Sequence, residues 1–235
     1  DDEIWVLGKG LAAPFVCSVL NKQLKIIKEF KGEELLGTEY VHPFADQVPQ
    51  YKELKKKHPR IHTVVLSKEY VDFTAGTGLV HTAPGCGPED YEVGKEYNIP
   101  PFNTLSPQGE LTGMPAFAGR IAKKDDPKFI KDLEATGALV ATTDVEHEYP
   151  HCWRCHKAVV FRTTKQWFFK IEDLKDEMIK KNAAVHWVPK TQAFDSWTAH
   201  LRDNSVTRQR HWGTPVPIWK CDKCTEVEII GSIKE

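Results

Sequence analysis

The sequence contains no long apolar run and almost no net charge, and each absence excludes a class of protein. No uninterrupted hydrophobic stretch approaches the ~18 residues of a membrane span, and the first residues, Asp1-Asp2-Glu3, lack the basic start of a signal peptide. Lys and Arg number 32 against 33 Asp and Glu, so the net charge is −1. The overall charge therefore does not favour binding to a polyanion. We therefore expect a cytoplasmic protein without a membrane segment, whose nucleic-acid contacts are local.

The composition, 40% hydrophobic and 28% charged, suits one large or two modest globular domains with a real core. Apolar spacing and start and stop residues predict several helices, at residues 11–20, from Gly87-Pro88-Glu89-Asp90 onward, between Asp125-Asp126-Pro127 and Gly137, and at 172–182. Apolar or β-branched segments predict strands, at residues 4–7, 24–30, 61–66, 78–83, 138–142 and 158–164.

One segment concentrates conformationally special residues around a few reactive ones. Residues 76–91 read GTGLVHTAPGCGPEDY, in which the glycines and prolines predict a strand that ends in a tight turn leading into a helix. If so, His81 and Asp90 both border the turn. A carboxylate there suits a substrate ammonium, and an imidazole suits a hydroxyl or carbonyl. The alternative is structural: an acid in a first helical turn serves the dipole, and a histidine at a strand end is simply packed.

Four of the six cysteines form two Cys-x-x-Cys pairs, Cys152 with Cys155 and Cys221 with Cys224. In a cytosolic chain this spacing favours metal over disulfides, and together the pairs supply the four ligands of a tetrahedral zinc site. The remaining Cys17 and Cys86 stand alone. Structural zinc is therefore an expected cofactor.

Two further segments suit charged ligands less specifically. The basic tract at residues 52–60, KELKKKHPR, is either a solvated helix face or loop, or a local contact for RNA phosphates. Residues 208–219, RQRHWGTPVPIW, cannot form a regular helix because of their prolines. They suit a fixed loop bordering a charged ligand.

Together with Pro150-His151-Cys152-Trp153-Arg154, residues 76–91 and 208–219 resemble isoleucyl-tRNA synthetases over essentially the whole chain. The run His81-Thr82-Ala83-Pro84 separates this branch from valyl enzymes, which typically carry Lys-Ile-Thr-Pro-Ala-His, and leucyl enzymes, which carry Met-Ala-Val-Pro-Ala-His. The resemblance implies the connective insertion with its editing domain at residues 1–149. Residues 150–235 would then be a Cys-pair segment returning toward the catalytic domain.

The resemblance also implies roles for single residues. Asp90 would hold the α-ammonium of a misactivated valine, and His81 would line the same pocket beside the terminal adenosine of tRNA(Ile). Gly76, Thr77, Gly78, Thr82 and Ala83 would complete the substrate-binding segment. Cys86 stands where many relatives have His, so we expect a small packed thiol there. In relatives each Cys pair tends to belong to a separate zinc knuckle, which favours half-sites here.

The implied fold is α+β, with a mostly antiparallel, barrel-like sheet, flanking helices and a smaller zinc-knuckle segment. The implied activity is hydrolysis of valyl-tRNA(Ile), after transfer and also at the adenylate stage, in a monomer. The His-Ile-Gly-His and Lys-Met-Ser-Lys-Ser signatures are missing, so ATP would act only in a full-length enzyme, and the family's upstream threonine-rich peptide is missing as well. Two rivals stay open: a valyl editing domain that clears threonine, and a non-catalytic, zinc-stabilised tRNA-binding module.

Overall fold

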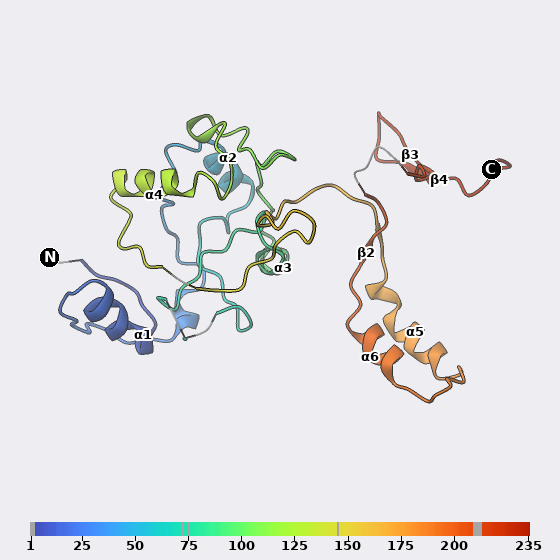
Figure 1. Ribbon diagram of the computed structural model, residues 1–235, viewed down its shortest axis with the longest axis horizontal. Coiled ribbons are helices and arrows are strands. Elements are labelled where there is room, and N and C mark those ends of the chain that lie inside the picture. The colour runs from blue at the N-terminus through green and yellow to red at the C-terminus, as the bar shows by residue number, and fades with distance from the viewer. Residues whose placement is uncertain (1–2, 72, 75, 145, 209–212) are drawn as a thin grey trace. The chain divides into compact units, whose positions relative to one another are not determined.

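The computed structural model describes residues 3–71, 73–74, 76–144, 146–208 and 213–235. The chain forms two compact units, Asp1–Thr163 (unit 1) and Thr164–Glu235 (unit 2) (Figure 1). The functional division into residues 1–149 and 150–235 stays a prediction. Across the described residues, every helix is too short or too polar to cross a lipid bilayer.

The predicted first helix is present, but in two forms. Lys9–Ala13 is an α-helix (α1), and Pro14–Val19 continues it as a π-helix (η1). Pro14 has no backbone N–H, so the regular α-helical ladder cannot pass through it unchanged. The helical spacing still buries Leu11 and Val16, which are 7% and 4% exposed.

Three longer helices form unit 1 together with short 3₁₀ turns at Gly32–Leu35 (η2) and Pro115–Phe117 (η3). The basic tract lies mostly on α2, Gln50–Lys57. The predicted start of α3, Pro88–Glu96, is confirmed, with Pro88 in its first turn. Likewise α4, Asp126–Ala135, begins beside Pro127 and is followed by Gly137 at a φ of +73°, the left-handed conformation typical of a helix stop.

The core of unit 1 is small and aromatic. Val48, Met114 and Phe117 are buried, and partly buried apolar side chains pack around them, namely Phe44, Tyr51, Phe102, Leu111 and Phe129. These residues bring the loop before α2, the segment around η3 and α4 together (Figure 1). The same core carries Tyr51 and Phe102 to the surroundings of the candidate site.

Unit 2 contains η4 (Glu172–Leu174), α5 (Lys175–Asn182), α6 (Ala193–Ala199) and two two-stranded sheets. The predicted helix over residues 172–182 is thus confirmed as η4 followed by α5. Phe168–Phe169 (β1) pairs with Asn204–Ser205 (β2), and Ile218–Lys220 (β3) pairs with Val227–Ile229 (β4), both antiparallel. Buried Asn182 joins α5 to α6, because its Nδ2 donates to Asp195 Oδ1 at 2.8 Å.

The predicted fold class is wrong. Within the described residues there are six α-helices and two two-stranded antiparallel sheets, and no barrel. A segment with strand-like composition forms a strand only when another segment pairs with its backbone N–H and C=O groups. Residues 61–66 reach only an isolated bridge, Glu39 with Thr63. Residues 78–83 begin at Gly78 with a φ of +79°, and the N–H of Ala83 is taken by a side chain, so no ladder forms there.

Candidate functional site

The segment around the predicted site folds as an irregular stretch, a turn and a helix. Cys86 N–H donates to Ala83 O at 2.8 Å, which closes the turn. Gly87 then precedes α3 in an extended conformation. The turn is packed tightly against the loop after α3, because a Cβ at Gly85 would lie 2.1 Å from Phe102 O. The glycine content of this motif therefore reflects close backbone approach as well as turn geometry.

Asp90 lies in the first turn of α3 and faces back toward the motif. Its Oδ2 accepts a hydrogen bond from Ala83 N–H at 3.1 Å, and the residue is half-buried. Asp90 is also close to Gly87, since a Cβ there would lie 3.3 Å from the same oxygen. The structure thus links Asp90 directly to the run His81-Thr82-Ala83-Pro84, while its place beside the positive helix end serves the dipole as well.

His81 is exposed and borders a group of aromatic rings. Its ring centroid lies 6.2 Å from that of His42. His42 in turn stacks on His62 at 5.2 Å and contacts the edge of Tyr51 at 4.8 Å. Sequence reasoning missed His42 and His62, because no local spacing connects them to residues 76–91.

The environment of these rings shifts their pKa values. Burial lowers the pKa of His42 to about 4, with His62 and His81 adding to the effect as neighbouring positive charges. Burial, then Lys55 and His81, lower the pKa of His62. At neutral pH both rings are uncharged. The site therefore combines the Asp90 carboxylate with the neutral rings of His42 and His62.

The predicted substrate-binding glycines lie in a second contact region. Gly8 N–H donates to Thr77 O at 2.7 Å, and Gly78 lies so close to Gly8 that a Cβ on it would be 3.0 Å from Gly8 Cα. Thr77 Oγ1 donates to its neighbour Leu79 O at 3.1 Å. Thr77 and Gly78 thus belong to the contact with the N-terminal segment, whereas a Cβ at Gly76 would meet nothing within 4 Å. Ala83 touches Asp90, and Thr82 is half-buried beside it.

Cys86 differs from the expected packed thiol, because it is exposed. Partial desolvation, followed by the nearby Asp90 carboxylate, raises its pKa. The side chain is therefore a protonated thiol at neutral pH rather than a nucleophilic thiolate.

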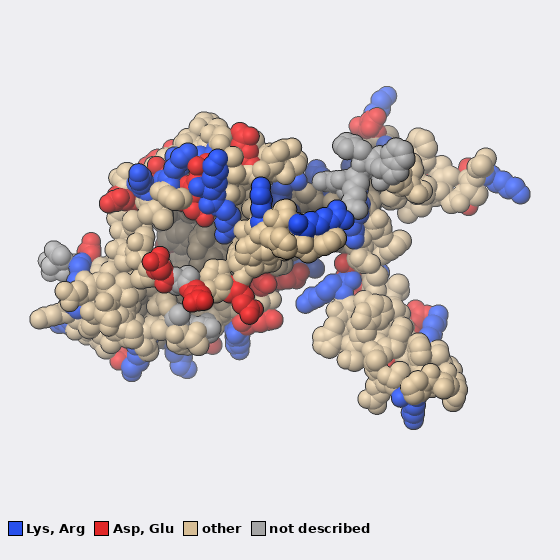
Figure 2. All heavy atoms as spheres, in the orientation of Figure 1, with Lys and Arg blue, Asp and Glu red and all other residues tan. Residues whose placement is uncertain are grey.

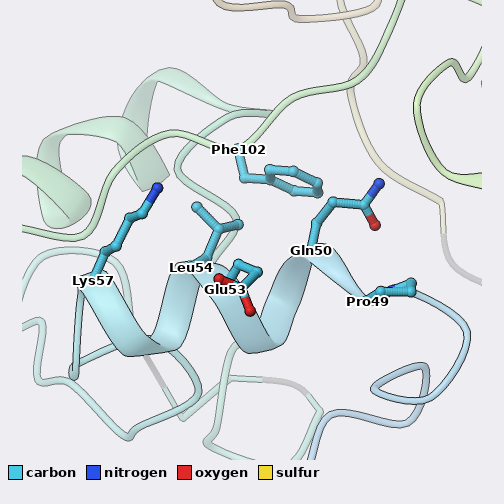
Figure 3. A pocket seen from close by; sticks show the side chains of 6 residues that line it. All are labelled: Pro49, Gln50, Glu53, Leu54, Lys57 and Phe102. Atoms are coloured by element: carbon cyan, nitrogen blue, oxygen red, sulfur yellow. The ribbon is translucent and has the colours of Figure 1, made fainter.

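A pocket of about 500 Å³ adjoins the ring cluster. In Figure 3, Gln50 and Leu54 project from one side of α2 toward the Phe102 ring, and Pro49, Glu53 and Lys57 complete the lining. Phe102 links this pocket to the ring cluster, since its ring centroid lies 5.7 Å from that of Tyr51. The pocket is mostly apolar, with one acidic and one basic side chain, Glu53 and Lys57, in its lining.

The basic tract forms the outer surface of α2, and Figure 2 shows Lys and Arg side chains gathered over this part of unit 1. Most of these lysines are exposed, and three form ion pairs: Lys56 with Glu53 at 2.7 Å, Lys55 with Glu39 at 3.2 Å and Lys52 with Asp46 at 3.7 Å. The solvated helix face is thus present. Of the other predicted ligand loop, residues 209–212 lie outside the described part, and Arg208 donates to Ser205 O and Thr207 O.

The cysteine pairs have the local chemistry of metal ligands. Backbone N–H groups of Cys155 and Arg154 lower the pKa of Cys152, and those of Lys223 and Cys224, together with the Cys224 thiol, lower the pKa of Cys221. Both shifts favour the thiolate, the form that binds zinc. Within the described residues no group of three or more His, Cys, Asp or Glu side chains is arranged to hold a metal ion. Each pair thus supplies two thiol ligands whose chemistry suits a metal ion.

Comparisons with known proteins agree on one family. The family model described as tRNA synthetases class I (I, L, M and V) matches residues 26–235. The chain is 42% identical over 237 residues to the isoleucine–tRNA ligase of Pyrococcus abyssi, covering 100% of this chain and 22% of that protein. It is 40% identical to the ligase of Pyrococcus furiosus and 38% identical to that of Methanopyrus kandleri, with the same coverage. The chain thus spans about a fifth of the length of the curated relatives it matches.

Proposed function

Because the chain belongs to the class I tRNA synthetases of the isoleucine, leucine, methionine and valine group, we propose that it is the editing domain of an isoleucine–tRNA ligase. Its proposed activity is hydrolysis of valyl-tRNA(Ile), and of valyl-adenylate before transfer. The observation that carries the proposal is the contact of Asp90 with the run His81-Thr82-Ala83-Pro84, in a chain that resembles isoleucine–tRNA ligases throughout its length.

The need for such a site follows from the substrates. Isoleucine and valine differ by one methylene, and an apolar pocket converts that difference into only ~1–3 kcal/mol, the discrimination known for this pair of amino acids. A second pocket that admits valine and excludes isoleucine corrects the remaining errors. Size exclusion then supplies accuracy that binding alone does not.

Hydrolysis in this site depends mainly on positioning. The Asp90 carboxylate pairs with the α-ammonium and fixes the ester carbonyl relative to an attacking water. The water oxygen bonds to the carbonyl carbon, and the bond from that carbon to the ribose oxygen breaks. One proton of the water ends on that ribose oxygen, which becomes a hydroxyl, and the other leaves to solvent as valine departs as a carboxylate. Backbone N–H groups of the turn stabilise the developing oxyanion, and His81 hydrogen-bonds the terminal adenosine.

The experiment that tests this function compares two mischarged tRNAs. We expect the intact ligase to deacylate valyl-tRNA(Ile) and to leave isoleucyl-tRNA(Ile) charged, because the pocket sorts by size. Preferential deacylation of threonyl-tRNA(Val) would assign the chain to the valyl branch. Salt-sensitive tRNA binding through the lysines of α2, without turnover of either ester, would support the non-catalytic module instead.

We further propose structural zinc, with Cys152 and Cys155 in one half-site and Cys221 and Cys224 in another. Zinc bound there would cross-link loop segments without taking part in hydrolysis. The prediction is that the 235-residue chain alone retains less than one tightly bound zinc, measured by elemental analysis, and that its thiols react readily with a thiol reagent. One zinc per chain with four protected thiols would show a single shared site.

The remaining properties are proposed on the same basis. The partner is the 3′ end of tRNA(Ile), and valine is the amino acid removed. We propose a cytoplasmic monomer. ATP would be used only by the synthetic site of the full-length ligase.

A further inference from the structure

The imidazole cluster is made by three segments that are distant in sequence. His42 precedes α2, His62 follows α2, and His81 belongs to the motif of the candidate site. His42 stacks on His62, with 5.2 Å between centroids and 28° between planes, and lies 6.2 Å from His81. The edge of Tyr51 from α2 closes the group, at 4.8 Å from His42 and 5.1 Å from His62.

Hydrogen bonding fixes the protonation state of the central ring. The backbone N–H of Phe44 donates to His42 Nδ1 at 3.0 Å. Since Nδ1 accepts this bond, it carries no proton, and neutral His42 has its proton on Nε2. Protonation of His42 would place a hydrogen on Nδ1 and break the bond. The backbone therefore opposes a charge on His42 by geometry alone.

Of the titratable groups around His42, the two other histidines add to the effect of burial in lowering its pKa. His62 and His81 are its imidazole neighbours. From α2, Tyr51 contacts the rings, and Lys55 lies near enough to His62 to lower the pKa of that ring. The ring centroids of Tyr40 and His62 lie 5.7 Å apart. Burial, and then the Cys86 thiol, raise the pKa of Tyr51. The Lys55 ammonium is paired with Glu39, and the Asp90 carboxylate accepts the hydrogen bond of Ala83 N–H and contributes to the raised pKa of Cys86, after burial.

We propose that His42 and His62 are positioning residues of the editing site: their stacked rings support the His81 ring and, because they are neutral, add no positive charge near the ammonium that Asp90 holds. This inference rests on the proposed function. The substrate's ammonium and terminal adenosine must enter a site with one carboxylate. A cationic imidazole next to His81 would repel the ammonium and weaken its pairing with Asp90.

The lowered pKa values give the proposal a pH dependence with a defined sign. An unfolded histidine binds its proton at about pH 6.5, whereas folded His42 binds it at about pH 4. Between these values the unfolded chain carries more protons, so the folded state loses stability as the pH falls through this window. Hydrolysis is expected to fall over the lower part of the same window, as His42 becomes charged.

The test uses two substitutions of one residue in the intact ligase. His42→Ala removes the ring and is expected to slow deacylation of valyl-tRNA(Ile) by about 10-fold at pH 7.5, because His81 loses its support. His42→Phe keeps a neutral ring and is expected to retain the rate within about twofold while shifting the acid limb of the pH–rate profile to lower pH. His186→Ala, at an exposed histidine of unit 2, is the control and should match wild type.

Two outcomes would overturn the inference. The first is wild-type rates and an unchanged acid limb in both His42 variants, with all variants folded by thermal melting. The second comes from NMR titration of the histidine rings, which needs no activity. It is an ordinary pKa for His42 in the wild-type chain that does not change in the His62→Phe variant. If wild type fails to deacylate valyl-tRNA(Ile) but His42 titrates near pH 4 and responds to His62→Phe, the proposed function fails while the coupled cluster stands.

Discussion

Asp90→Ala is expected to slow hydrolysis of valyl-tRNA(Ile) by at least about 100-fold and to leave isoleucine activation unchanged. The carboxylate is the only charge proposed to hold the substrate's ammonium, and misplacing a reacting group by about 1 Å is enough for a loss of this size. Single-turnover deacylation of valyl-tRNA(Ile) measures the effect. Activation is followed separately by isoleucine-dependent pyrophosphate exchange.

Two further variants separate charge from structure. Asp90→Asn keeps an oxygen that can accept the hydrogen bond of Ala83 N–H but removes the charge, so it should lose nearly as much activity as Asp90→Ala while unfolding like wild type. Glu89→Ala removes the exposed neighbouring acid of the same helical turn and should change little. Normal deacylation by Asp90→Asn would show that Asp90 only accepts the hydrogen bond of the motif and that its charge does not hold the substrate.

Gly85→Ala is expected to destabilise unit 1 by about 2–3 kcal/mol, the range of overpacking in a site that cannot relax. The new Cβ would lie 2.1 Å from Phe102 O and 2.6 Å from Phe102 C, both backbone atoms. The loop would have to move away, and the hydrogen bond from Asn103 Nδ2 to Gly85 O at 2.5 Å would be strained. Urea unfolding, followed by tryptophan fluorescence, gives the change in free energy of unfolding.

Gly10→Ala provides the matched control. Gly10 lies within α1, and a Cβ there meets nothing within 4 Å. Alanine should therefore leave stability unchanged or raise it by up to about 1 kcal/mol, because it restricts the unfolded chain and favours helix. Equal effects of the two substitutions would show that the close approach of the motif to Phe102 does not constrain the turn.

Helices were predicted from this sequence more successfully than strands, for a physical reason. Helix signals are local: Pro88 with two acids predicts the start of α3, and Gly137 predicts the end of α4. A strand is completed only by a partner elsewhere in the chain. Residues 61–66 have strand composition, yet they form only the bridge at Thr63, and the expected barrel-like sheet is wrong.

In the candidate site, too, the residues of one short motif could be predicted from the sequence, and those brought in from distant segments could not. His81 and Asp90 stand out in the sequence because they belong to one short motif, and the structure links that motif to Asp90 through Ala83. His42 and His62 join the site through ring contacts across the fold. No spacing rule connects residues so far apart, although the aromatic run around His42-Pro43-Phe44 marks a place where packing is dense.

The most direct test of the account is a structure of the intact ligase with a non-hydrolysable amide analogue of valyl-adenosine. The account predicts that the Asp90 carboxylate lies within hydrogen-bonding distance of the α-ammonium and that His81, backed by His42, contacts the adenosine. An analogue bound in the α2 pocket beside Phe102, or with its ammonium away from Asp90, would contradict the assignment of the editing site.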